Sequence, residues 1–148
     1  MSIVQTATTS FKVELPQGVH NFGPTGADTF KIALYGPSAS LGYDTATYTA
    51  SGEVVGTGYT AGGKTLTINI SPTPGLNANN VPTAFLSFAN IAWTNATFTT
   101  RGALIYNSTE GNKSVAVLDF GTDKVVDNDT FQIIFPTPDA TSAIVRIS

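Results

Sequence analysis

Side chains that commonly perform catalysis or bind metals are scarce in this sequence. The chain of 148 residues has one histidine, His20, and no cysteine. A histidine works as a general base when a nucleophile and an orienting group meet it, and the chain has no Gly-x-Ser-x-Gly motif. His20 also lies in a segment rich in proline and glycine, which indicates a loop. We therefore predict that His20 has a structural role, capping or packing, and that no thiolate or multi-histidine metal site exists.

Four aspartates between two predicted strands form the arrangement closest to a cation site: Asp119, Asp123, Asp127 and Asp129. Asp127 and Asp129, with Asn128 between them, resemble a fragment of a calcium loop. Such a loop also needs a glycine at its sixth position and a glutamate at its twelfth, and neither is present. Aspartate and asparagine favour turns because their side chains bind the nearby backbone. We therefore predict a turn and assign no metal ligands.

The segment 58–65 matches the phosphate-binding expression G-x-x-x-x-G-K-T letter for letter. That motif works only between a strand and a helix, whose N-terminus cradles the phosphate. Here the residues that follow, KTLTINI, alternate as a strand. The sequence therefore predicts a glycine-rich β-turn connection, and we assign no cofactor-binding residues.

A protein that acts on carbohydrate would present paired carboxylates or an exposed aromatic platform. Glu14, Glu53 and Glu110 show no paired pattern, so we assign no catalytic residues and predict that the chain is not an enzyme. Trp93, which has three phenylalanines nearby in sequence, could form a sugar platform, although a core aromatic cluster is the commoner arrangement. A carbohydrate-binding β-sandwich module stays as an alternative.

The composition favours strands and excludes several classes of partner. Charged residues make up 11% and hydrophobic residues 41%, and threonine is abundant with 23 copies. The net charge of −3 and the absence of a basic stripe argue against nucleic-acid binding. No apolar run is long enough for a membrane helix, and the first residues show no signal-peptide pattern. We expect synthesis in a cytoplasm and no membrane partner.

Alternating apolar residues recur at short spacing along the chain and predict an all-β fold. The architecture expected is an antiparallel β-sandwich or a jelly-roll-like barrel of about 8–10 short strands with an extended N-terminal arm. The predicted strands cover 11–15, 28–35, 64–70, 83–93, 96–106, 114–120, 130–135 and 143–147. We divide the chain into an arm over 1–10 and a single β-sandwich domain over 11–148.

The arm is predicted to dock on a partner. Residues 1–9 are small and polar, whereas Phe11, Val13 and Leu15 would share one face of a strand able to join another sheet. These three residues are our candidate partner-binding residues.

The sequence also predicts the local structure of three further segments. Residues 71–82 read as a loop, and Thr45–Tyr48 as a short helical turn with Asp44 at its N-cap. Residues 103–120 read as a hairpin in which Leu118 and Phe120 face the core and Asp119 faces outward.

Five strings in this chain resemble a family of small virion proteins of tailed bacteriophages. They are TFKIALYGPSASLG (29–42), GTGYTAGGKTL (56–66), RGALIYNSTEGNKSVAVLDFG (101–121), TFQIIFP (130–136) and AIVRI (143–147). They occur in order over residues 28–148. The resemblance implies a non-enzymatic structural protein of the virion and brings no catalytic residues.

Within the particle, the resemblance favours a capsid decoration (cement) protein that binds and stabilises the major capsid shell. A neck, tail or head-fibre component is the alternative placement. The partners implied are the major capsid protein and further copies of the chain, as a dimer or trimer, and the localisation implied is the capsid surface.

Overall fold

The computed structural model describes residues 2–148 and confirms the all-β prediction. Strands make up 49% of the chain and helix 4%, and the strands form two antiparallel sheets. Over the described residues neither sheet closes into a barrel, which excludes the barrel alternative.

The chain forms two compact units, and the single β-sandwich domain expected over 11–148 stays a prediction. The first unit comprises residues 1–20, 28–65 and 93–131, and the second comprises 21–27, 66–92 and 132–148.

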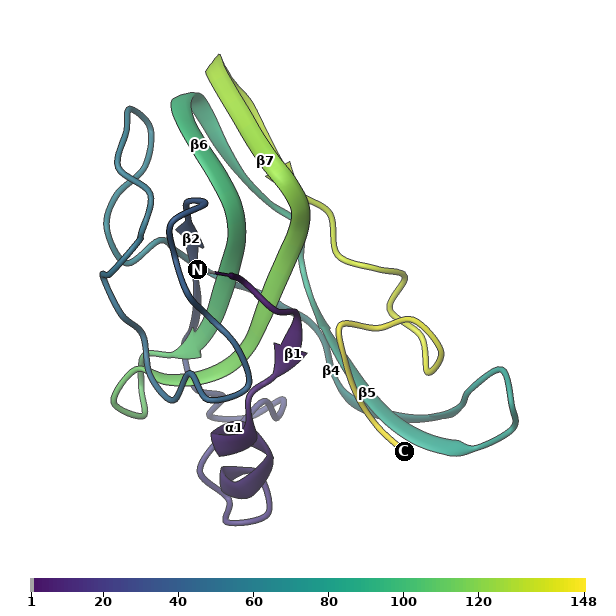
Figure 1. The fold of residues 1–148 in the computed structure, drawn as a ribbon. Helices are drawn as coiled ribbons and strands as arrows, with labels where there is room; N and C mark the ends of the chain where they lie inside the picture. Colours follow the sequence, from purple (N-terminus) through teal and green to yellow (C-terminus); the bar gives the residue numbers. More distant parts are fainter. Residues whose placement is uncertain (1) are drawn as a thin grey trace. The chain divides into compact units, whose positions relative to one another are not determined.

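The first unit contains a five-stranded sheet in the order β1-β7-β6-β2-β3 (Figure 1). Its strands are β1 (Thr6–Ala7), β2 (Phe30–Tyr35), β3 (Lys64–Thr65), β6 (Ile91–Asn107) and β7 (Lys113–Ile133). β2 pairs with β6 in a regular register from Phe30–Asn107 to Tyr35–Gly102. The predicted hairpin is confirmed, because β6 and β7 are joined by a turn in which Gly111 and Asn112 have positive φ.

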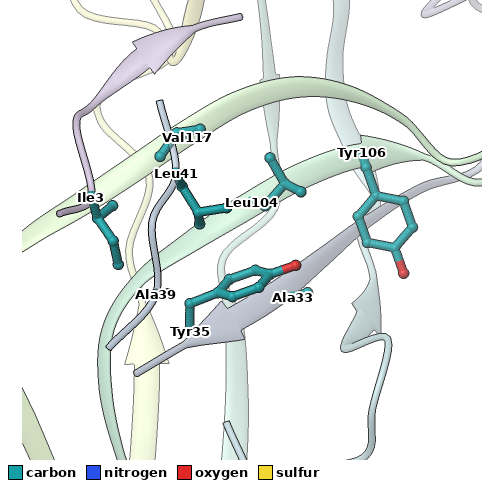
Figure 2. Close-up of a cluster of buried hydrophobic side chains, with 8 residues drawn as sticks. All are labelled: Ile3, Ala33, Tyr35, Ala39, Leu41, Leu104, Tyr106 and Val117. Carbon is teal, nitrogen blue, oxygen red and sulfur yellow. The ribbon is translucent and has the colours of Figure 1, made fainter. Parts of the chain in front are cut away.

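The core of the first unit gathers side chains from its sheet and from two irregular segments. Figure 2 shows these side chains converging: Ile3, Ala33, Tyr35, Ala39, Leu41, Leu104, Tyr106 and Val117. Both faces of β7 are covered near its start, because Val115 and Val117 are fully buried and Leu118 is also buried. The prediction that Leu118 is in the core is therefore confirmed, whereas Phe120 is half-buried.

The N-terminal segment is extended, but it is part of the first unit's core. Ile3 is 8% exposed, and residues on both sides of it form backbone hydrogen bonds with Leu41. β1 then pairs with β7, with Thr6 opposite Val117 and Ala7 opposite Ala116. The segment predicted as an arm therefore contributes to the core, because Ile3 supplies an apolar side chain that closes one side of the cluster.

The strand predicted at 11–15 is also wrong, because this stretch lies in and at the end of helix α1 (Thr9–Glu14). Thr8 is the N-cap, and its side chain accepts a hydrogen bond from the backbone N–H of Phe11. An alternating pattern over five residues also fits a short helix that buries one side chain, and the cap decides between the two.

β7 reverses its direction between Phe120 and Phe131. The centroids of these two rings are 5.7 Å apart, although eleven extended residues would span about 36 Å. Gly121 and Asn128, both with positive φ, provide local backbone changes within this part of the strand. The segment 121–130, predicted as a loop, is therefore a strand that folds back.

The second unit contains a three-stranded sheet in the order β4-β5-β8. Its strands are β4 (Ile68–Leu76), β5 (Pro82–Phe88) and β8 (Val145–Ile147). The loop predicted over 71–82 is thus mostly β4 and a tight turn, in which Asn80 N–H donates to the carbonyl of Asn77. The strand predicted over 64–70 is divided between β3 and β4, which belong to different sheets.

The core of the second unit is built around Phe88, which is 1% exposed. Its ring lies 6.4 Å from that of Phe22 and 5.9 Å from that of Phe135, measured between centroids. Leu86 and Val145 are buried opposite each other on β5 and β8.

Edge strands of both sheets are short or carry residues that oppose strand addition. β1 and β3 have two residues each, and β8 has three. β4 contains Pro72 and Pro74, which have no backbone N–H to offer to a further strand.

Candidate functional site

His20 lies in a buried polar cluster of the first unit. Its Nε2 atom is 3.1 Å from Glu14 Oε1, and its Nδ1 atom is 3.1 Å from Asn107 Nδ2. Its ring also lies against Phe11, with centroids 5.0 Å apart. These contacts join helix α1 to the end of β6.

Asn107 fixes the tautomer of His20. The Oδ1 atom of Asn107 accepts hydrogen bonds from the N–H groups of Thr109 and Glu110, so its Nδ2 group faces His20 and also donates to Asp28. His20 Nδ1 is therefore an acceptor, and the ring proton sits on Nε2, from which it is donated to Glu14. This arrangement holds the turn after β6 in place, which agrees with the structural role predicted for His20.

Glu14 receives two hydrogen bonds from cationic or polarised donors. Lys113 Nζ lies 3.1 Å from Glu14 Oε2, on the opposite oxygen from His20. Burial raises the pKa of the Glu14 carboxyl, but the hydrogen bonds from His20 and Lys113 outweigh burial and leave the pKa below its ordinary value.

A second polar cluster surrounds Glu53. The hydroxyl groups of Tyr48 and Tyr59 donate to the two carboxylate oxygens of Glu53, each at 2.6 Å. The N–H of Gly62 donates to Glu53 Oε1 at 2.7 Å, and the hydroxyl of Tyr106 donates to the carbonyl of Gly62. The sequence gives no sign of this cluster, because the irregular loop from 48 to 62 must fold before these side chains meet Glu53.

The tyrosines of this cluster keep their protons to high pH. Burial and then the hydrogen bond to Glu53 raise the pKa of Tyr48 to about 12. Burial and the same carboxylate also raise the pKa of Tyr59 and of Tyr35. All of these hydroxyl groups donate within the protein, so the cluster braces the loop from 48 to 62.

The segment that matches the phosphate-binding expression has a different role in the fold. Lys64 begins strand β3 and no helix follows, as the sequence predicts. Gly63 has a φ of 76°, and a Cβ atom there would overlap the carbonyl oxygen of Ile32. The glycines therefore allow close approach of the backbone to β2.

Two of the four clustered aspartates, Asp119 and Asp123, form ion pairs with Arg101. The guanidinium lies 3.6 Å from Asp119 and 3.3 Å from Asp123, and all three side chains are partly exposed. Among residues 2–148, no three side chains of histidine, cysteine, aspartate or glutamate come together in a metal-binding group.

Trp93 is 1% exposed and cannot act as a sugar platform. Its ring contacts those of Tyr59 and Phe131, with centroids 6.3 Å and 6.0 Å away. The core interpretation of Trp93 is confirmed.

The second unit presents an apolar surface on one face of its sheet. Pro74 lies opposite Ala84, which lies opposite Ile147, and Leu76 lies opposite Pro82. Directly opposite residues in antiparallel strands point to the same face, and all five side chains are exposed, with Leu76 at 63% and Ile147 at 53%. We call this set the apolar sheet face.

The scarcity of charge in the second unit is a sequence signal for this surface. Within the second unit, Asp139 and Arg146 are the only charged residues. Stretches without charge in a chain with charged residues elsewhere point to surfaces that meet another protein.

The candidate partner-binding residues differ widely in exposure. Phe11 is 4% exposed, Leu15 is half-buried, and Val13 is 56% exposed on helix α1. The three side chains do not form one strand face as predicted, and Val13 is the member that a partner can reach.

No protein-family model, curated protein or solved structure matches this chain. In the part of the chain that the structure describes, no helix is long and apolar enough to cross a membrane.

Proposed function

We propose that this protein is a non-enzymatic structural component of a bacteriophage virion, and specifically a decoration protein that binds and stabilises the major capsid shell. The observation that carries the proposal is the apolar sheet face. Five exposed apolar side chains on three adjacent strands form a surface suited to attachment to another protein.

The polar clusters support a structural interpretation. His20 and Glu53 are the groups best suited to acid–base chemistry, and both are bound by neighbouring side chains or backbone groups of the first unit. Hydrogen bonds of this kind join irregular segments to the sheet and stiffen them. A rigid domain with an attachment surface suits a protein that reinforces a shell.

The resemblance of five strings to small virion proteins of tailed phages supports the placement. Contact with the capsid would involve helix α1, where Val13 offers an exposed apolar side chain beside Lys12. The major capsid protein is the partner proposed for this helix.

Quantitative mass spectrometry of purified particles tests the proposal. A decoration protein should be present in hundreds of copies, comparable with the major capsid protein. About six or twelve copies would instead place it in the neck or tail, because those structures have sixfold or twelvefold symmetry. Absence of the chain from intact particles would overturn a virion role altogether.

A second experiment measures binding directly. Purified protein should bind to capsids that lack it and raise the temperature at which they release DNA. A glycan-binding screen serves as the comparison, since a carbohydrate-binding module would bind sugars and leave capsid stability unchanged.

A further inference from the structure

We infer that the contact between His20 and Asn107 is an acid-operated switch. When His20 takes a second proton, the side-chain amide of Asn107 must turn over, and the turn between β6 and β7 (residues 108–112) is released from it. The inference concerns the first unit alone and does not depend on the proposed virion role.

Both ring nitrogens of His20 are committed to protein groups. Nδ1 accepts from Asn107 Nδ2, and the proton on Nε2 is donated to Glu14. The side chain is 0% exposed, and the rings of Phe11 and Phe30 lie on it with centroids 5.0 Å and 6.5 Å away. A change at either nitrogen must therefore be answered by a group of the protein.

A second proton on His20 conflicts with the present position of Asn107. A charged histidine donates from both nitrogens. Nδ1–H would then point at the Nδ2 group of Asn107, which is also a donor and lies 3.1 Å away. Two buried donors that face each other are left unsatisfied, and each costs its desolvation. The amide removes this conflict by turning its Oδ1 atom toward the ring.

The cost of turning the amide falls on the turn after β6. In the present position, Asn107 Oδ1 accepts from the N–H groups of Thr109 and Glu110, at 3.1 Å and 3.3 Å. Its Nδ2 group donates to Asp28 at 2.8 Å. After the amide turns over, a donor would face the two N–H groups and an acceptor would face the carboxylate. The charged form of His20 and the bound turn therefore exclude each other.

The charged groups of this cluster come from three elements. Glu14 belongs to α1, Lys113 begins β7 and contacts Glu14 Oε2 at 3.1 Å, and Asp28 lies in the segment before β2. The two carboxylates attract a second proton to His20, and only the Asn107 contact opposes it. Glu14 accepts from Nε2 in both forms of the ring, so α1 keeps its contact while the turn is released.

An NMR titration of the purified chain from about pH 7.5 to about pH 5 tests the inference, because histidine changes charge in this range. His20 is the only histidine, so the ring nitrogen signals are its own. The backbone N–H signals of Thr109 and Glu110 report the turn. They should shift with the same midpoint as the ring signals, while the rest of the spectrum remains that of the folded chain.

The turn between β4 and β5 is the matched internal control. There, Asn77 Oδ1 accepts from the N–H groups of Asn79 and Val81, which is the same arrangement without a histidine. The N–H signals of Asn79 and Val81 should not shift over the same range.

Two variants separate the switch from a general effect of acid. His20→Gln removes the titrating ring, so its turn signals should stay constant. In Asn107→Asp, the carboxylate accepts from the turn N–H groups and from a charged ring at the same time. The ring should therefore still titrate in Asn107→Asp, but the turn signals should not follow it.

Three results would overturn the inference. The ring of the wild type titrates while the Thr109 and Glu110 signals stay in place, or the whole chain unfolds before the ring is charged, or the control turn shifts as much. If His20→Gln does not fold, Asn107→Asp decides alone, and turn signals that still follow its ring overturn the switch.

Discussion

Val13 and Phe11 are two positions apart, yet the helix gives them different roles. Phe11 packs against the His20 ring, whereas Val13 faces outward. We predict that Val13→Asp weakens binding to capsids by at least about tenfold, a loss of about 1.4 kcal/mol, and leaves the melting temperature unchanged. Phe11→Ala should instead lower the melting temperature, because it leaves a cavity beside His20.

Capsid pelleting assays and thermal melts measure the two effects. Val55→Asp is the control for the added charge, since Val55 is exposed on the same unit. If Val13→Asp binds capsids as well as the wild type, helix α1 is not the capsid contact.

Because the pKa of Glu14 is shifted in the folded protein, the free energy of unfolding depends on pH. Its pKa in the folded protein is below the ordinary value of 4.5 because the hydrogen bonds from His20 and Lys113 outweigh burial. The stabilisation is therefore complete above the ordinary carboxyl pKa and is lost as the pH falls through the lowered one. We predict that Glu14→Gln melts well below the wild type at pH 7 and that this difference shrinks toward pH 3.

Melting temperatures measured at several pH values test this prediction. Asp44→Asn is the control for the loss of one acidic side chain, because Asp44 is exposed in a turn. A Glu14→Gln difference that stays the same between pH 7 and pH 3 would contradict the linkage.

At the scale of the elements, the N-terminal segment stabilises the fold of the first unit. Ile3 is 8% exposed in the core cluster, so Ile3→Ala should cost about 2–5 kcal/mol and lower the melting temperature by about 10 °C. Val4→Ala, at an exposed neighbouring position, is the matched control and should have little effect. Equal melting temperatures for the two variants would show that the segment is a loose arm, as the sequence predicts.

The connection before β3 offers a second prediction at this scale. Gly63 and Gly111 both have positive φ, but only at Gly63 would a Cβ atom overlap backbone. Gly111→Ala should therefore cost about 1 kcal/mol for the left-handed conformation alone. Gly63→Ala should cost clearly more, as measured by chemical denaturation, because β2 and β3 must move apart. Similar losses for both variants would contradict the close approach.

Strands could be predicted well where an apolar run is bounded by turn residues. β2 and the facing parts of β6 and β7 are such runs, and their residues are buried on both faces. Helix α1 could not be predicted from alternation, because its position depends on the Thr8 cap and on burial of Phe11 against His20. The division of 64–70 between two sheets also has no local signal, since KTLTINI alternates throughout.

The candidate surfaces were harder to predict than the strands. The apolar sheet face depends on which residues of β4, β5 and β8 stand opposite one another, and these strands are far apart in the sequence. The Glu53 cluster depends on contacts among residues 48, 59 and 62 that only the folded loops bring together. The absence of catalytic motifs could be stated from the sequence, but a docking residue could not be chosen without knowing burial.

Over the whole molecule, charge and apolar surface are separated. The net charge of −3 belongs to the first unit, and the apolar sheet face belongs to the second. Salt screens repulsion between the first units of two copies and does not weaken an apolar contact. We therefore predict that any self-association of the chain is strengthened or left unchanged when the NaCl concentration is raised.

Sedimentation equilibrium at low and high NaCl measures this dependence. An interface held by ion pairs would behave in the opposite way and dissociate as salt is added. Dissociation by salt would therefore show that the copies meet through the charged first unit.

The protected strand edges determine how this threonine-rich β-protein behaves when it is crowded. Open edges in a chain of this composition would recruit one neighbour after another and grow into fibrils. Here the edges end in strands of two or three residues or carry Pro72 and Pro74. Many copies can therefore be held at high local concentration without polymerising through these edges.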